Sequence, residues 1–152
     1  MHNSWYMEIF AIISPYTLAI VITWLSAHAI KYVINNLKNQ KTSFSQQIFM
    51  SGGMPSAHSA TIMALSTVIG FRDGFDSGLF GLAILIAMIV MYDATKVRRS
   101  AGEQGLAIKE LIKEQGSKVK IPYTAQGHIV SEVVVGAIFG TIIGIVVFLA
   151  TK

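Results

Sequence analysis

Two histidines and a glutamate are the residues of this sequence best suited to nucleophilic or acid–base chemistry. His128 and Glu132, in the stretch GHIVSEV, are four residues apart, so on a helix their side chains share one face and can meet. A carboxylate beside an imidazole selects the tautomer of the ring and stabilises the imidazolium that forms when the ring attacks or takes a proton. The same spacing is explained by a buried pair whose two side chains hydrogen-bond each other and have no chemical role. Taken alone, the spacing favours this explanation.

The second histidine, His58, lies in the stretch GGMPSAHSA, residues 52–60, which opens an apolar segment. Pro55 has the fixed φ suited to the first position of a helix, so we expect the amides of residues 56–58 to point unbonded toward an anion. Gly53 and the glycine before it would let the backbone approach a ligand closely, and the serine hydroxyl would add a donor. An ordinary glycine turn and a packed histidine explain the same residues.

Cations that match phosphate oxygens follow in the stretch YDATKVRR, which ends with Arg98 and Arg99. Guanidinium groups are planar, permanently charged donor forks. Lys31 adds a further positive charge, and Asp93, an acid at the end of an apolar helix, needs a partner such as one of the two arginines. The ordinary explanation for these cations is that loops beside membrane spans are rich in Lys and Arg.

The composition indicates an integral membrane protein. Hydrophobic residues make up 53% of the chain and charged residues only 13%, which is far from the balance of a soluble domain of 152 residues. The length allows one bundle of spanning helices, so we expect a single membrane domain over residues 1–152. The chain has no cysteine, which excludes disulfides, thiol catalysis and cysteine-ligated metal sites.

Apolar stretches predict an all-α bundle of about four transmembrane helices. The first stretch, near 10–30, could instead be a signal peptide, but no Lys or Arg precedes it, which favours a retained helix. The second is short and rich in Ser, Thr and Ala, which suits a helix surrounded by other helices. The predicted spans lie near 10–30, 56–71, 78–94 and 129–150.

Charge asymmetry predicts the orientation of the bundle. Ten of the 12 Lys and Arg residues fall in the loops near 31–55 and 95–127, which places both loops in the cytoplasm and both termini outside a cell membrane. The net charge of +4 then reflects topology and anionic lipid head groups, and we expect no nucleic-acid partner. Within the second loop, residues 100–116 predict a short amphipathic helix, either in the membrane interface or as a solvated connector. The topology brings His58, Asp93 and His128 to one cytoplasmic boundary.

Three motifs in this order resemble a known family. Pro55-Ser56-Ala57-His58 is similar to the P-S-G-H motif of the PAP2 superfamily of phosphatidic acid phosphatases and vanadium haloperoxidases, and His128-x3-Glu132 to its H-x3-D motif. The divergent small membrane branch is a closer match, with GGMPS-x-HSA, YDA-x-x-VRR and GH-x3-EV all present. The resemblance covers roughly Gly52 to Gly140.

The resemblance implies roles for individual residues. His128 would be the nucleophile that forms a phosphohistidine, Glu132 would orient it, and His58 would protonate the leaving oxygen. Ser56 and the amides around it, including that of Gly53, would hold phosphate oxygens.

The sequence departs from the superfamily in its cationic motifs. The K-x6-R-P motif is absent, and the S-R pair expected before the second histidine is replaced by residues 121–122, Ile-Pro. Arg98, Arg99 and Lys31 would stand in for these cations, with Asp93 in support.

The resulting expectation is a membrane-embedded phosphatase that needs no cofactor and no metal. A site at a membrane boundary points to a lipid phosphate or a prenyl diphosphate as substrate, with surrounding membrane lipids as further partners. Gly136, Gly140 and Gly144 form a face that would suit either a homodimer or packing within the monomer.

Two other functions fit the same residues. The two histidines with Glu132 and Asp93 could bind a divalent cation in a metal-dependent enzyme. A small transporter or a non-catalytic protein that binds lipid phosphates would also place polar residues at a membrane boundary.

Overall fold

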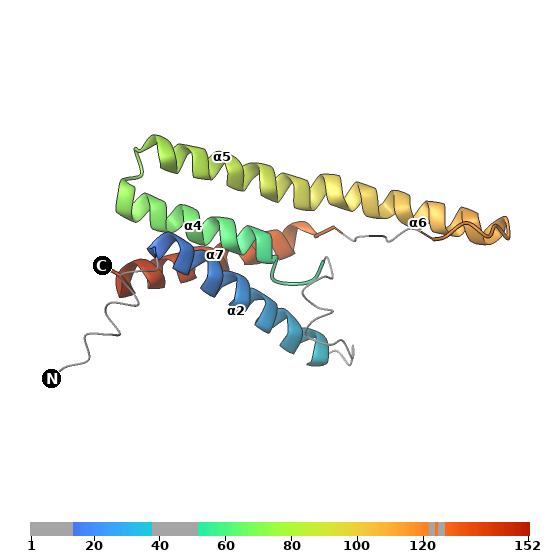
Figure 1. Ribbon diagram of the computed structural model, residues 1–152, viewed down its shortest axis with the longest axis horizontal. Coiled ribbons are helices and arrows are strands. Elements are labelled where there is room, and N and C mark those ends of the chain that lie inside the picture. Colours follow the sequence, from blue (N-terminus) through green and yellow to red (C-terminus); the bar gives the residue numbers. More distant parts are fainter. Residues whose placement is uncertain (1–13, 38–51, 122–123, 125–126) are drawn as a thin grey trace.

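The computed structural model describes residues 14–37, 52–121, 124 and 127–152, and all of its regular elements are helical. Part of the span predicted near 10–30 and part of the loop predicted near 31–55 lie outside the described residues. Figure 1 shows a bundle of helices, one of which extends well beyond the others. The elements in chain order are α2 (Pro15–Leu37), α4 (Ala57–Asp73), α5 (Gly78–Tyr92), the π-helical turn η1 (Asp93–Val97), α6 (Arg98–Glu114) and α7 (Val130–Ala150).

Helix α4 lies at the centre of the bundle and packs against α2, α5 and α7. Its buried residues are mostly Ala, Ser and Thr, and the hydroxyls of Ser66 and Thr67 donate to carbonyls one turn earlier at 2.8 and 2.7 Å. The large apolar side chains of α5 and α7, such as Leu85 and Ile138, face outward. Small residues inside and large apolar residues outside are typical of a helix bundle in lipid. The prediction that α4 is surrounded by other helices is confirmed.

The glycine face of α7 packs against α4 within the monomer. A methyl group on Gly136 would lie 2.5 Å from the carbonyl oxygen of Ser56, and one on Gly140 would collide with the carbonyl oxygen of Ala60. Backbones can approach this closely only where no Cβ intervenes. Of the two uses that the sequence allowed for this face, the structure therefore shows packing within the monomer.

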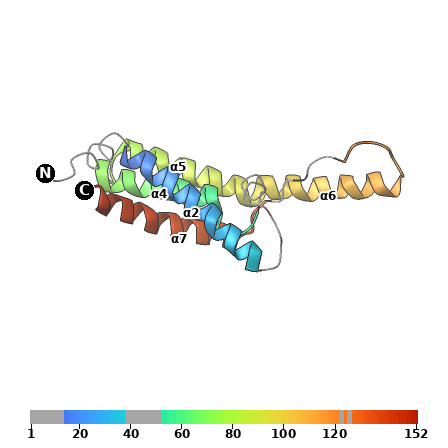
Figure 2. The same ribbon diagram turned by 60° about the horizontal axis from the view of Figure 1, so that its bottom comes forward.

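Helices α5 and α6 form one continuous helix from Gly78 to Glu114, joined by the π-helical turn η1. This corrects the expectation of a span ending near residue 94 followed by a separate short helix at 100–116. At 1.5 Å per residue its 37 residues span about 55 Å. Both views show α6 extending along the axis of α5 beyond the other helices (Figures 1 and 2).

Within the residues that the structure describes, three helices are long and apolar enough to cross a membrane: α2, the continuous helix 78–114, and α7. Helix α4 has 17 residues and is shorter than these. Helix α2 continues past Lys31 to Leu37, about two turns beyond the end predicted for the first span. The loop predicted over 95–127 is helical as far as Glu114.

Polar contacts between helix ends fix which ends lie together. The hydroxyl of Tyr16 in α2 donates to Asp73 at the end of α4 at 2.6 Å, and Arg72 donates to the Thr151 hydroxyl after α7 at 3.1 Å. The starts of α4 and α7 therefore lie at the opposite end of the bundle. This end contains the predicted site residues.

Candidate active site

His128 and Glu132 form a hydrogen-bonded pair at the start of α7. The distance from His128 Nδ1 to Glu132 Oε2 is 2.8 Å, and the histidine is only 6% exposed. The same carboxylate oxygen accepts from the Ile129 amide at 3.4 Å, so Glu132 also caps the helix. Because a carboxylate accepts, Nδ1 of the neutral ring carries the proton and Nε2 keeps its lone pair.

The π-helical turn η1 holds the backbone of His128. The His128 amide donates to the carbonyl of Ala94 at 3.0 Å. A π turn shifts the hydrogen-bond register of a helix by one residue, so at its return to α geometry one carbonyl has no helical donor. The turn thus provides an acceptor for a residue 34 positions away in the sequence.

Burial lowers the pKa of His128 below its usual value, and the hydrogen bond with Glu132 opposes this effect without cancelling it. Nearby Lys31 and Arg98 lower the pKa further, because their positive charges disfavour an imidazolium. The ring is therefore neutral at pH 7. A neutral imidazole with a free Nε2 lone pair can act as a nucleophile or a base.

Helix α4 begins two residues after Pro55, which the sequence suggested as its first position. Ser56 is the N-cap and Ala57 the first helical residue, so Pro55 precedes the cap. The Ser56 hydroxyl accepts from the Ser59 amide at 3.4 Å, and the Ser56 amide donates to the carbonyl of Glu132 at 3.1 Å. The expectation of an unbonded Ser56 amide is therefore wrong, because the start of α7 occupies it.

Two amides at the start of α4 remain open. Those of Ala57 and His58 have no hydrogen-bond acceptor among the described residues. Unbonded amides in the first turn carry the positive end of the helix dipole. The link between Ser56 and Glu132 places this turn beside the His128 pair.

Lys31 contributes a buried positive charge from α2. It is 3% exposed, and its aliphatic stem lies beside Gly53, where an added Cβ would be 3.6 Å from Lys31 Cδ. Its ammonium interacts electrostatically with His58, His128 and Glu132. Among the residues that the structure describes, no carboxylate lies within ion-pair distance of it.

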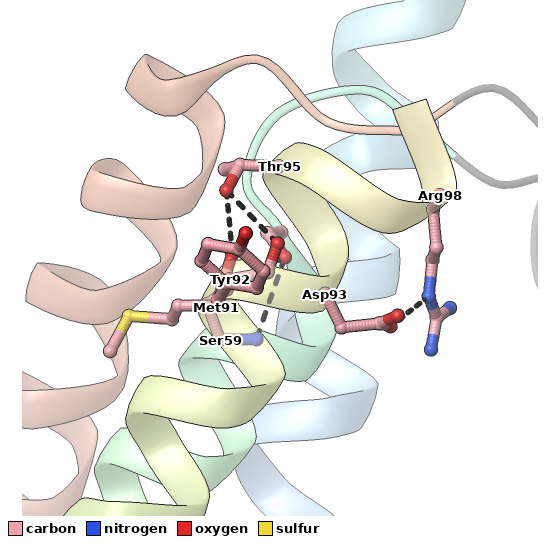
Figure 3. A network of polar contacts seen from close by, with 7 residues as sticks. Ser59, Met91, Tyr92, Asp93, Thr95 and Arg98 are labelled. Atoms are coloured by element: carbon pink, nitrogen blue, oxygen red, sulfur yellow. Dashed lines mark hydrogen bonds and ion pairs between the residues drawn. The ribbon is translucent and has the colours of Figure 1, made fainter. Parts of the chain in front are cut away.

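Arg98 belongs to this cluster, whereas Arg99 points elsewhere. Arg98 interacts electrostatically with both His58 and His128. Its Nε lies 2.6 Å from Asp93 Oδ2, and Figure 3 shows the carboxylate directed at the guanidinium. The partner expected for Asp93 is thus Arg98. Arg99 pairs at 3.1 Å with Glu103 on the exposed side of α6, although it also borders a cavity of about 200 Å³ with His128.

The structure therefore brings together six of the predicted residues: Lys31, His58, Asp93, Arg98, His128 and Glu132. No group of three or more histidine or acidic side chains that could hold a metal ion occurs in the described part of the chain. A cavity of about 570 Å³ lies between α2 and α7 at the other end of the bundle. This cavity is far from His58 and His128, so it is not part of the candidate active site.

Sequence reasoning missed two features of the site. His28 on α2 is 5% exposed, contacts the Trp24 ring at a centroid distance of 4.5 Å, and interacts electrostatically with His58 and Lys31. Its position one turn before Lys31 on the same helix was the available signal. Nothing in the sequence could have indicated the role of the Ala94 carbonyl, because backbone geometry alone makes it an acceptor for the His128 amide.

Comparison with known proteins places this arrangement in a family. The sequence profile described as the divergent PAP2 family matches residues 14–143, which include every residue of the cluster. The chain belongs to the divergent PAP2 family. This assignment confirms the resemblance inferred from the three motifs.

A curated relative of this divergent PAP2 protein is an uncharacterized membrane protein, YuiD, of Bacillus subtilis (strain 168). The two are 44% identical over 86 residues, which span 57% of this chain and 54% of the relative. The relative and the three apolar helices together support a membrane protein. No solved structure matches the chain.

Proposed function

We propose that this protein hydrolyses a phosphorylated lipid, a lipid phosphate or prenyl diphosphate, through a phosphohistidine at the cytoplasmic face of a cell membrane. The observation that carries the proposal is the hydrogen bond from buried His128 to Glu132, whose geometry leaves His128 Nε2 free to attack. Membership of the divergent PAP2 family supports a phosphatase-related role. In the proposed topology α4 forms a fourth crossing, and the site lies on the side rich in Lys and Arg.

The proposed reaction has two displacements. His128 Nε2 forms a bond to phosphorus while the bond to the lipid oxygen breaks, and His58 passes a proton to that oxygen. A water molecule then attacks the phosphohistidine and transfers a proton to His58, the P–N bond breaks, and phosphate leaves. Lys31, Arg98 and the two open amides of α4 offset the charge on the equatorial oxygens, as positioned donors do in phosphoryl transfer.

The decisive experiment measures phosphate release from a panel of lipid phosphates by the protein purified in detergent. We expect release that persists with chelator and is inhibited by vanadate, and an acid-labile phosphoprotein after rapid quenching. His128→Ala removes both the release, by about 10³-fold or more, and the phosphoprotein. Glu103→Gln, on the exposed side of α6, is the matched control. A His128→Ala protein that keeps normal turnover would refute the nucleophile.

A non-catalytic protein that binds lipid phosphates is the second candidate. The observation that favours it is the internal use of Ser56, whose amide and hydroxyl are both hydrogen-bonded within the protein. Such a protein retains lipid phosphates on a column or in a pull-down but releases no phosphate from any of them. Activity that chelator abolishes would instead favour a metal-dependent site.

A further inference from the structure

An apolar groove lies between α2, α4 and α5, beside the proposed site. Its volume is about 200 Å³, and the surface that lines it is apolar. The side chains that line it include Ile20 and Trp24 of α2, His58, Ile62 and Leu65 of α4, and Val90 of α5. His58 is thus shared by the groove and by the cluster of charged residues.

The groove extends from His58 along the helix axes. His58, Ile62 and Leu65 follow one face of α4 at spacings of four and three residues, which corresponds to an axial distance of about 10 Å. Trp24 and Ile20 follow α2 in the same direction, because the two helices are antiparallel. The groove therefore begins at the charged end of the bundle and leads toward the opposite end.

Charge and polarity along the groove match an anionic amphiphile. At one end, the positive charges of Lys31 and Arg98 act on His58 and outnumber the negative charge of Asp93, so this end suits a phosphate. Beyond His58 the lining is apolar, so it suits a hydrocarbon. A soluble phosphate ester would leave this part of the groove unused.

The length of the groove suits the first part of one hydrocarbon chain. From His58 to Leu65 the lined face of α4 extends for about 10 Å, and no polar surface of the described residues lines the groove. We propose that the groove binds the first several carbons of a single-chain lipid phosphate, such as a prenyl or alkyl phosphate, with the phosphate at His58. The inference rests on the proposed function for the identity of the site. It predicts that lipid phosphates with one chain are preferred over lipids with two chains.

Trp24 offers a binding assay that does not depend on turnover. The chain has two tryptophans, so a Trp5→Phe background leaves Trp24 as the sole emitter. The probe is an alkyl phosphonate with bromine atoms on the first half of its chain, because bromine quenches tryptophan on contact and a phosphonate has no ester bond to cleave. The control probe is the brominated alcohol of the same length.

We expect the phosphonate to quench Trp24 at a concentration about tenfold or more below that of the alcohol, because charged hydrogen bonds hold its head group. Lys31→Gln removes most of this difference. Equal quenching by both probes means that the groove holds bulk lipid only and overturns the inference.

Filling the groove separates this inference from the proposed function. Ile62→Phe lowers kcat/KM for decyl phosphate much more than for ethyl phosphate, and the wild-type protein prefers decyl phosphate to a phosphatidate with two decanoyl chains. Leu85→Phe, on the outward face of α5, is the matched control and changes neither the kcat/KM values nor this preference.

Hydrolysis that is independent of chain length, or a preference for the phosphatidate, overturns the groove inference but leaves the proposed phosphatase activity standing. Absence of phosphate release from every substrate refutes the phosphatase, while Trp24 quenching still reports on the groove.

Discussion

Replacing Gly140 by alanine puts a methyl group where α7 touches the backbone of α4. The added Cβ would lie 2.6 Å from the carbonyl carbon of Ala60, which is 0.8 Å short of an ordinary 3.4 Å contact. The obstacle is backbone and cannot rotate away, so the two helices must separate. Overpacking of this kind costs about 1–3 kcal/mol, whereas the helix propensity of alanine returns about 1 kcal/mol relative to glycine. We therefore expect a net loss of up to about 2 kcal/mol.

Gly81→Ala in α5 is the matched control, because a Cβ at Gly81 meets nothing within 4 Å. Its propensity gain is unopposed and stabilises the protein by up to about 1 kcal/mol. The assay is thermal unfolding in detergent followed by circular dichroism, in which 1 kcal/mol corresponds to about 2–4 °C for a chain of this size. Gly140→Ala should lower the melting temperature and Gly81→Ala should raise it. Equal shifts in the two variants would refute the close packing of α7 on α4.

Three further predictions concern the site. The lowered pKa of His128 keeps its ring neutral below the usual value of about 6.5, so the acidic limb of kcat/KM against pH lies below pH 6.5. Glu132→Gln removes the group that raises this pKa and so moves the limb to still lower pH, while kcat falls; a limb that moves upward contradicts the pairing. Arg98→Gln lowers phosphate release by about 10²-fold or more. Arg99→Gln keeps release near the wild-type rate, because the guanidinium of Arg99 pairs with Glu103. Equal losses in steady-state assays would show that both arginines contact phosphate. His28→Leu raises the melting temperature, because the buried Nδ1 of His28 has no hydrogen-bond partner among the described residues and such an atom costs about 1–3 kcal/mol. A lower melting temperature would show that His28 has a partner outside the described residues.

The arrangement of the helices could be predicted from the sequence because it follows from local patterns. Apolar runs located α4, α5 and α7 to within a few residues, and alternation of direction alone brought His58, Asp93 and His128 to one end. The spacing of His128 and Glu132 was enough to predict their contact, since three to four residues separate neighbours on a helix face.

Contacts between distant segments could not be predicted in this way. The Ser56 amide is occupied by the Glu132 carbonyl, 76 positions away, and no local pattern reports such a bond. Other errors had a visible cause. Serine is a preferred N-cap, so Ser56 could have been assigned to that position instead of Pro55 to the first turn. No proline or glycine interrupts the chain between Tyr92 and Ala101, which is consistent with one continuous helix.

The continuous helix carries α6 beyond the bundle, and η1 marks the point where it leaves. Beyond this turn, the 17 residues of α6 extend for about 25 Å, and the first of them pack on the segment that precedes α7, where a Cβ on Gly127 would lie 2.6 Å from Arg99 Cα. The Ala94 carbonyl within η1 accepts from the His128 amide, so the π-helical turn and the start of α6 together position the histidine. The place of His128 therefore depends on the same helix that extends beyond the bundle.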